Sequence, residues 1–234
     1  RRAGFRVAPF KAQNMSLNSF VTPEGGEIGR AQALQAEACG IPPHVDMNPI
    51  LLKPESDSRS QIIVQGKVFA TREARAYFAR SRDSELFRAV ERSYNRLASQ
   101  YEVMVIEGAG SAAEVNLRDR DLVNWPVVEM ADAKVVLVGD IDRGGVFAQI
   151  IGTLDLIALE ERNRVGGIVI NKFRGDAALF ADGVRFLTER TGIPVLGVLP
   201  FLRDLALDQE DSLDVDIRRQ VAFQRDCINL AVIL

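Results

Sequence analysis

Short apolar runs alternate with longer helical patterns along the 234-residue chain. The clearest runs are "VMVIEGAG", "AKVVLVGD", "GGIVINKF" and "IPVLGVLP", and each ends in a polar or glycine-rich turn. The helical patterns "VFAQIIGTLDLIALEERN" and "DAALFADGVRFLTERTG" separate three of them. Near-continuous apolar strands that alternate with helices are typical of a parallel sheet with both faces covered. The pattern predicts an α/β fold with a mostly parallel sheet and helices on both faces.

The first hundred residues predict further elements. An apolar run ends at Pro9, and residues 26–40 have the apolar spacing of a helix that Gly40 would stop. Residues 41–60 are punctuated by prolines and predict a loop. Residues 60–70 predict a β-hairpin with Gly66 at its turn. The stretch over 84–101 places apolar residues on one stripe of a helix, namely Leu86, Val90, Tyr94, Leu97 and Tyr101.

Ligands of parallel α/β sheets bind at the carboxyl ends of the strands. This rule selects five segments without any motif. They are residues 11–18, 107–111, 140–145, 171–175, and the chain from Pro200 onward. We therefore expect the chemistry of this protein to lie in these turns.

The segment after the first apolar run is rich in neutral hydrogen-bonding groups around one cation. It holds Lys11, Gln13, Asn14, Ser16 and Asn18. A lysine at a strand end can pair with a phosphate or a carboxylate, and amides hydrogen-bond without adding charge. The segment predicts contacts with a large ligand that carries carboxylates and amides.

Glu107 follows a hydrophobic strand and precedes the glycine turn Gly108–Gly110. A carboxylate at such a place can hold Mg²⁺, which takes one or two carboxylates together with phosphate oxygens. The alternative is a carboxylate that caps the following turn. The glycines favour the metal site, because they let backbone approach a ligand closely.

Two more strand ends carry polar side chains. Asp140 and Asp142 follow one strand, where Asp142 also suits the N-cap of the next helix. Asn171 and Lys172 end another strand, and an asparagine can offer a donor and an acceptor to a purine edge. We assign Asn171, Lys172 and Asp140 to nucleotide binding.

Composition excludes several classes of function. The net charge of −3 gives no electrostatic footprint for nucleic acid, and no apolar run reaches the length of a membrane span. Cys39 and Cys227 are too few for a disulfide framework, which favours a reducing cytoplasm. With His44 as the single histidine, a Cys–His or Ser–His catalytic pair has almost no candidates.

The residues resemble a known family over most of the chain, from Arg1 to about Asp211. The segments "PFKAQNMSLNSFVTPEGGEIGRAQALQAEACGIPPHVDMNPILLKPESDSRSQIIVQGKV", "VIEGAGSAAEVNLRDRDLVNWPVVEMADAKVVLVGDIDRGGVFAQIIGTLDLI", "GIVINKFRGD" and "GIPVLGVLPFL" are similar to the amino-terminal half of cobyric acid synthases. The resemblance implies a P-loop NTPase-like synthetase domain of the dethiobiotin synthetase type, followed by a glutaminase-like domain.

The family's reaction, as the resemblance implies it, amidates the b, d, e and g carboxylates of adenosylcobyrinic acid a,c-diamide in cobalamin biosynthesis. Each step uses ATP, Mg²⁺ and ammonia from glutamine. ATP phosphorylates a carboxylate and ammonia displaces the phosphate. The implied partners are the corrin substrate and a glutaminase domain that supplies ammonia, and a homodimer stays open.

The family's functional residues transfer one by one. Lys11 matches a lysine near the γ-phosphate and the substrate carboxylate, Glu107 a Mg²⁺-binding glutamate, and Asn171 an adenine-contacting asparagine. Related cobyrinic acid a,c-diamide synthases carry aspartates near Asn14 and Asn18. Here both are amides, which favours contact with corrin or phosphate over a metal.

The sequence contains no G-x-x-x-x-G-K-[ST] phosphate loop. We expect residues 1–203 to be a synthetase domain that lacks this loop, 204–227 a linker, and 228–234 the first strand of a missing glutaminase-like domain. Such a fragment alone is expected to be inactive. Two alternatives stay open: another dethiobiotin synthetase-like carboxylate-activating enzyme, and a ParA-like partner-switching ATPase.

Overall fold

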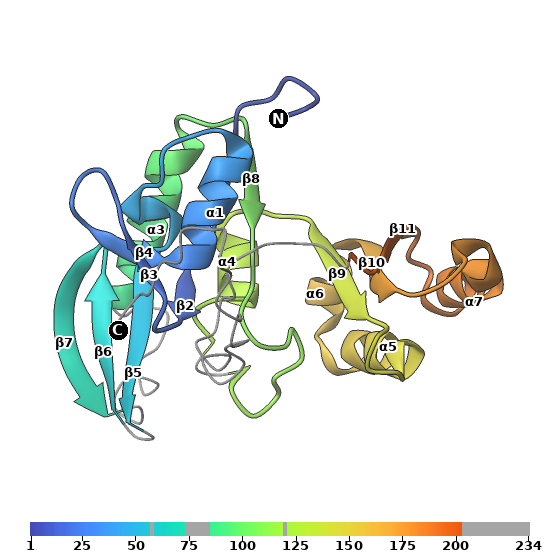
Figure 1. Cartoon of the computed structure of the whole chain (residues 1–234). Coiled ribbons are helices and arrows are strands. Elements are labelled where there is room, and N and C mark those ends of the chain that lie inside the picture. The colour runs from blue at the N-terminus through green and yellow to red at the C-terminus, as the bar shows by residue number, and fades with distance from the viewer. Residues whose placement is uncertain (57–58, 74–84, 119–120, 203–234) are drawn as a thin grey trace, which may run out of the picture.

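A computed structural model describes residues 1–56, 59–73, 85–118 and 121–202. It confirms the α/β prediction, with parallel sheets flanked by helices (Figure 1). The expected linker at 204–227 and the expected strand at 228–234 lie outside the described residues, so their assignments stay predictions.

The first parallel pair joins segments that are far apart in the sequence. β1 (Val7–Phe10) runs parallel to β8 (Val103–Ile106), with Phe10 opposite Ile106. α1 (Arg30–Cys39) and α3 (Glu85–Ala98) contact these strands, α1 against β1 and α3 against β8. α1 ends at Gly40, whose φ of 70° lies in the left-handed region that favours glycine at a helix end. This pairing brings the ends of β1 and β8 side by side.

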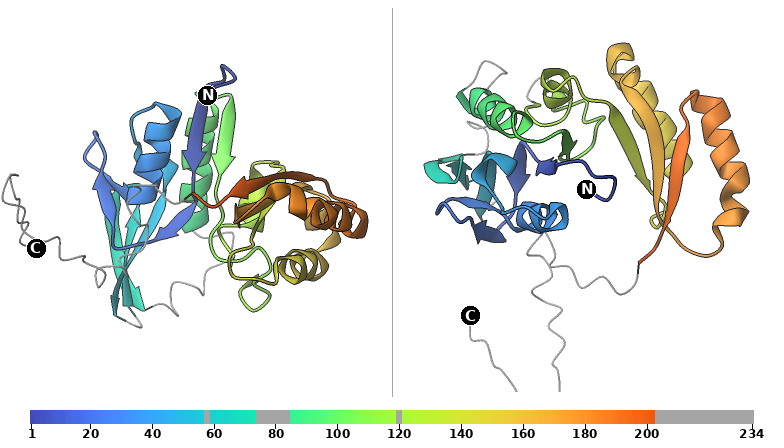
Figure 2. Two further views of the ribbon diagram at one scale, coloured as in Figure 1. Left: turned by 45° about the vertical axis from the view of Figure 1, so that its right-hand side comes forward. Right: turned by 90° about the horizontal axis from the view of Figure 1, so that it is seen from above.

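A second parallel sheet has the strand order β11-β10-β9. Its strands are β9 (Val135–Asp140), β10 (Val165–Phe173) and β11 (Val195–Pro200). The helices that accompany them are α5 (Val146–Leu156), α6 (Leu159–Arg162) and α7 (Ala181–Thr191), preceded by the 3₁₀ turn η3 (Ala177–Phe180). Seen from above, this sheet and its helices form one side of the molecule, and β1, α1 and α3 belong to the other (Figure 2).

The remaining strands form a mixed sheet and a small hairpin. β2 (Gln13–Met15) runs parallel to β5 (Ile50–Ser56), which continues antiparallel into β6 (Arg59–Val64) and β7 (Lys67–Glu73). β3 (Ser19–Val21) pairs antiparallel with β4 (Glu27–Gly29), and two short helical segments are η1 (Val45–Met47) and α4 (Trp125–Met130). The predicted hairpin with its turn at Gly66 is confirmed.

Two local predictions are wrong. Residues 50–56 form β5 instead of a loop, because Ile50, Leu51 and Leu52 are almost fully buried and outweigh the nearby prolines. The helix expected over 26–40 begins only at Arg30. Ile28 belongs to β4, and the buried face of α1 is made by Gln32, Ala33 and Ala36.

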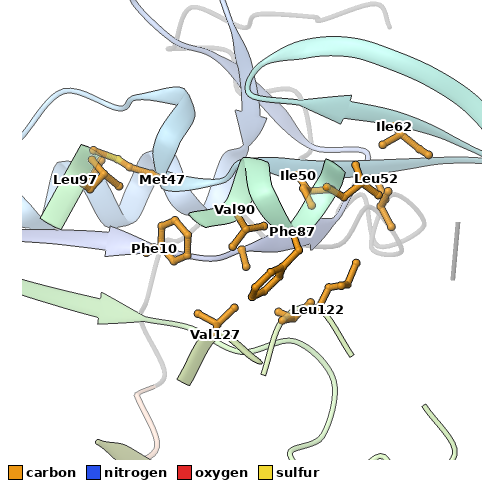
Figure 3. Packing of buried hydrophobic residues seen from close by; sticks show 14 residues of the cluster. Phe10, Met47, Ile50, Leu52, Ile62, Phe87, Val90, Leu97, Leu122 and Val127 are labelled. Carbon is orange, nitrogen blue, oxygen red and sulfur yellow. The ribbon is translucent and has the colours of Figure 1, made fainter. Parts of the chain in front are cut away.

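The larger hydrophobic cluster lies under β1 and between α3, β5 and α4 (Figure 3). Phe10 is fully buried there, and its ring meets the edge of Tyr94 with centroids 5.5 Å apart. Burying one such side chain contributes about 1.5–3 kcal/mol. The predicted stripe on α3 is confirmed by the burial of Leu86, Val90 and Leu97. This core fixes the residue that directly precedes Lys11.

Candidate functional site

Lys11 and Glu107 are brought together by the pairing of β1 with β8. Each follows directly on a paired residue, Phe10 and Ile106, and the backbone N–H of Glu107 donates to the carbonyl of Phe10 at 2.9 Å. Lys11 Nζ donates to Glu107 Oε1 at 2.9 Å, with 8% of the lysine side chain and 39% of the glutamate side chain exposed. The pair is therefore a largely buried cation against a carboxylate that still faces solvent.

Gln35 also contacts this pair, and the sequence pattern did not predict it. Its Nε2 donates to Glu107 Oε2 at 2.7 Å from the middle of α1. Both oxygens of Glu107 thus accept a hydrogen bond, one from β1's end and one from α1. The signal in the sequence was the pair Gln32 and Gln35, two amides three residues apart in an alanine-rich helix.

The amides after Lys11 are more buried than an open binding loop would be. Gln13, Asn14 and Ser16 each expose 9% or less. Asn14 Nδ2 donates to Gln32 Oε1 at 3.1 Å, while its Oδ1 accepts from the Met15 N–H at 3.0 Å. Asn14 therefore supports the local structure, and its predicted contact with substrate remains a prediction.

Asn18 is less buried and is held through its backbone. Its N–H donates to Ser16 Oγ at 3.0 Å, and the Ser16 hydroxyl also lies 3.3 Å from the Asn18 carbonyl oxygen. Ser16 thus shapes the turn that carries Asn18.

A cavity of about 380 Å³ opens beside this segment. Gln13 and Met15 line it on one side, and residues 109–115, 117, 118 and 121–125 line the other. Trp125 anchors that second wall by donating from Nε1 to the Ala112 carbonyl at 2.8 Å. The cavity begins where the Glu107 turn continues, so a ligand in it would lie next to the carboxyl end of β8.

Asp140 and Lys172 form a second pair, at the carboxyl ends of β9 and β10. Lys172 Nζ donates to Asp140 Oδ2 at 2.7 Å, and Asn171 lies opposite Asp140 in the register of the two strands. The hydrogen bond from Lys172 holds the pKa of the Asp140 carboxyl below its usual value. Lys172 itself has a φ of 60°, which is uncommon outside glycine and costs energy.

Asp142 and Arg174 extend this pair along the same sheet edge. Arg174 Nε donates to Asp142 Oδ1 at 2.6 Å, and the guanidinium lies 3.5 Å from the centroid of the Phe201 ring. The predicted site residues thus gather as two pairs, Lys11 with Glu107 and Asp140 with Lys172, each at the carboxyl ends of parallel strands.

Replacing Lys172 by methionine is expected to raise the pKa of Asp140 toward its ordinary value. The hydrogen bond from Lys172 is the largest cause of the lowered pKa, and methionine keeps the length of the side chain without the donor. In the wild type, the share of stability due to this carboxylate is present above its unfolded pKa. It is lost as the pH falls through the lower folded value.

A carbon-13 NMR titration of the Asp140 carboxyl measures this shift. Lys134→Met is the control, because Lys134 is not among the causes of the Asp140 shift. An unchanged midpoint in Lys172→Met would contradict the assigned partner.

The oxygen ligand available at this site, the Glu107 carboxylate, suits a hard cation whose other ligands are phosphate oxygens of a bound substrate. Among the residues that the structure describes, no group of three His, Cys, Asp or Glu side chains could hold a metal ion by itself. Glu107 offers a single, partly exposed carboxylate beside a glycine turn. Mg²⁺ is commonly bound in this way, through one or two carboxylates plus substrate phosphates.

In the described part of the chain, no helix is long and apolar enough to cross a membrane.

Comparison with known proteins yields a family and close relatives. A family model described as an AAA domain matches residues 52–209. The chain is 52% identical over 234 residues to a protein of Phocaeicola vulgatus named cobyric acid synthase, covering all of the chain and 47% of the relative. Proteins of the same name from Dehalococcoides mccartyi and Sorangium cellulosum are each 58% identical. These matches cover 92% and 95% of the chain and 42% of each relative. The chain spans about half the length of the curated relatives it matches.

Proposed function

We propose, from the premise that the chain belongs to the AAA domain family, a function in cobalamin biosynthesis; the family model matches residues 52–209. The chain is the carboxylate-activating part of an ATP- and glutamine-dependent amidotransferase. Its substrate is adenosylcobyrinic acid a,c-diamide, and its product, after amidation at b, d, e and g, is adenosylcobyric acid. The names of the relatives support this assignment, since cobyric acid synthases match 92–100% of the chain.

The observation that carries the proposal is the Lys11–Glu107 pair. Two opposite charges meet at the ends of neighbouring parallel strands, 2.9 Å apart. Gln13 and Ala109, each two residues further along the chain, line the 380 Å³ cavity. Phosphoryl transfer needs little covalent chemistry from the protein, and catalysis consists of positioning and charge stabilisation. Lys11 and Glu107, at the carboxyl ends of neighbouring strands, supply the positioning and the charge stabilisation.

Each residue has a separate role in this proposal. Lys11 places its ammonium against the transferring phosphoryl group and the carboxylate that receives it. Its burial limits the motion of that charge, so little reorganisation is needed during the reaction. Glu107 would hold Mg²⁺, which neutralises developing phosphoryl charge when it is bound with ATP.

The nucleotide base is assigned to the second pair. Asn171 offers its amide to the purine edge, while Lys172 and Asp140 fix the turn that presents it. The 2.7 Å bond between Lys172 and Asp140 supports this role, because it holds the backbone of residues 171–172 at the end of β10.

The substrate is assigned to the wall formed by Gln13, Asn14, Ser16 and Asn18. Neutral groups suit a substrate whose charge changes with each of four amidations. Hydrogen bonds of about 0.5–1.5 kcal/mol tolerate such a change better than ion pairs do. Gln13 lines the 380 Å³ cavity, which supports it as a direct contact.

The test of the proposed function is a reconstitution with the full-length protein. The protein receives adenosylcobyrinic acid a,c-diamide, ATP, Mg²⁺ and glutamine or ammonia, and the corrins are separated by chromatography. We expect four successive amidations, each coupled to one phosphate released. A protein that releases phosphate without amidating the corrin would refute the proposed substrate.

Asn18→Ala is expected to raise the KM for the corrin several-fold while the KM for ATP stays unchanged, because one neutral hydrogen bond of about 1 kcal/mol is lost. Asn95→Ala on the exposed face of α3 is the matched control. Equal corrin KM values in the two variants would remove Asn18 from the substrate wall.

A further inference from the structure

We propose that Gln35 is a positioning residue that orients the Glu107 carboxylate for the divalent cation. This inference rests on the proposed function, in which Glu107 holds Mg²⁺. It concerns a helix residue that lies outside all five strand-end segments. It assigns to α1 a part in the chemistry of the site.

The geometry gives Gln35 a place that no other described contact of Glu107 duplicates. Its amide N–H reaches Glu107 Oε2 at 2.7 Å, while Lys11 holds Oε1 at 2.9 Å. The two donors approach from different elements, α1 and the end of β1. With both oxygens held, rotation of the carboxylate about its terminal bond is restricted.

The chemistry of the donor fits this role. A second cation at this place would compete with a divalent metal for the carboxylate, whereas an amide donates a hydrogen bond and leaves the charge of the pair unchanged. Ligating carboxylates are commonly held by such neighbours. Removing one typically weakens metal binding by about 10–100-fold.

α1 presents Gln35 through the same face that supports the amide segment. Gln32, one turn earlier, is fully buried and accepts from Asn14 Nδ2 at 3.1 Å. Side chains three residues apart lie on one helical face. The helix therefore contacts Asn14 in β2 and Glu107 after β8 through two glutamines on one face, and only Gln35 reaches the carboxylate.

The test uses the full-length protein with Mn²⁺ as the probe and a non-hydrolysable ATP analogue. Electron paramagnetic resonance of free Mn²⁺ gives the dissociation constant without any turnover. Gln35→Met keeps the size of the side chain and removes the donor, and we expect Mn²⁺ to bind about tenfold more weakly. Gln35→Glu places a second carboxylate beside Glu107, and we expect Mn²⁺ to bind more tightly than in the wild type.

Gln32→Met is the matched control on the same helix face. It removes a buried hydrogen bond to Asn14 and is expected to leave Mn²⁺ affinity unchanged. If Gln35 only stabilised α1, both Gln35 variants would behave as this control does. Unchanged Mn²⁺ affinity in Gln35→Met, or a weaker affinity in both Gln35 variants, would overturn the inference.

Failure of the proposed function has a different signature. If wild type and Glu107→Gln bound Mn²⁺ equally in the presence of the nucleotide analogue, the metal role of Glu107 itself would be refuted. If Glu107→Gln lost Mn²⁺ and Gln35→Met did not, the proposed function would stand and the role of Gln35 would not.

Discussion

Glu107→Gln in the full-length protein is expected to keep the fold and to lose ATP-dependent amidation by about 100-fold or more. Glutamine preserves the shape of the side chain but removes the charge that would hold Mg²⁺. A metal that neutralises developing phosphoryl charge contributes several kcal/mol to lowering the barrier, and each 1.36 kcal/mol is about tenfold in rate. The amide also cannot form the ion pair with Lys11 Nζ. The measurement is phosphate release and corrin amidation at ordinary Mg²⁺.

Glu102→Gln is the control for this variant. Glu102 lies just before β8 and pairs with Arg6 on the exposed side, at 3.3 Å between Nε and Oε2. Both substitutions remove one carboxylate from an ion pair next to the same strand, so a general electrostatic effect would appear in both. We expect near-normal amidation in Glu102→Gln. Turnover in Glu107→Gln that equals this control would exclude the catalytic role of the carboxylate.

Arg96→Met is expected to destabilise the protein by about 3 kcal/mol. Arg96 Nε donates to Asp46 Oδ2 at 2.8 Å, and a second nitrogen of the guanidinium contacts the other carboxylate oxygen. The Asp46 side chain exposes 2% of its surface, so removing the arginine leaves a buried carboxylate without its charge partner. This pair ties η1 to α3. Urea unfolding followed by circular dichroism measures the loss.

The matched control replaces an arginine in an exposed pair. Arg164 Nη1 lies 2.8 Å from Asp132 Oδ1, but the Asp132 side chain is 92% exposed. Water screens that pair, and Arg164→Met is expected to cost less than about 1 kcal/mol. If the two variants were equally stable, burial of Asp46 would not be the source of the effect.

The strand ends could be predicted because they depend on local pattern. An apolar run followed by a polar turn marks the end of a strand wherever the strand later lies in the sheet. Lys11, Glu107 and Asp140 were found in this way, and the rule for parallel sheets placed them at the carboxyl ends of the strands, where ligands bind. The family resemblance added roles to these positions but did not supply their geometry.

The order of the strands could not be read from the pattern. Lys11 pairs with Glu107 across 96 residues because β1 neighbours β8, and Asp140 pairs with Lys172 because β9 neighbours β10. Apolar periodicity is the same for every buried strand, so it carries no information on which strand is adjacent. Strand order depends on packing between distant segments.

Burial likewise came only from the tertiary structure. The polar residues after Lys11 predicted contacts with a large ligand, yet Asn14 is 4% exposed and hydrogen-bonded to Gln32. Residues 50–56 contain a proline and still form β5, because Ile50 and its neighbours pack into the core. Local propensity is worth tenths of a kcal/mol per residue, while burying one large apolar side chain contributes about 1.5–3 kcal/mol.

The sequence by itself therefore determined the α/β class, the strand ends and the residue types available at each. Only the tertiary structure decided which of those ends meet and that Gln35 joins Glu107. The physical reason is that side-chain periodicity and turn chemistry are properties of neighbouring residues. A hydrogen bond of 2.7 Å between α1 and the end of β8 depends on how the helix packs on the sheet.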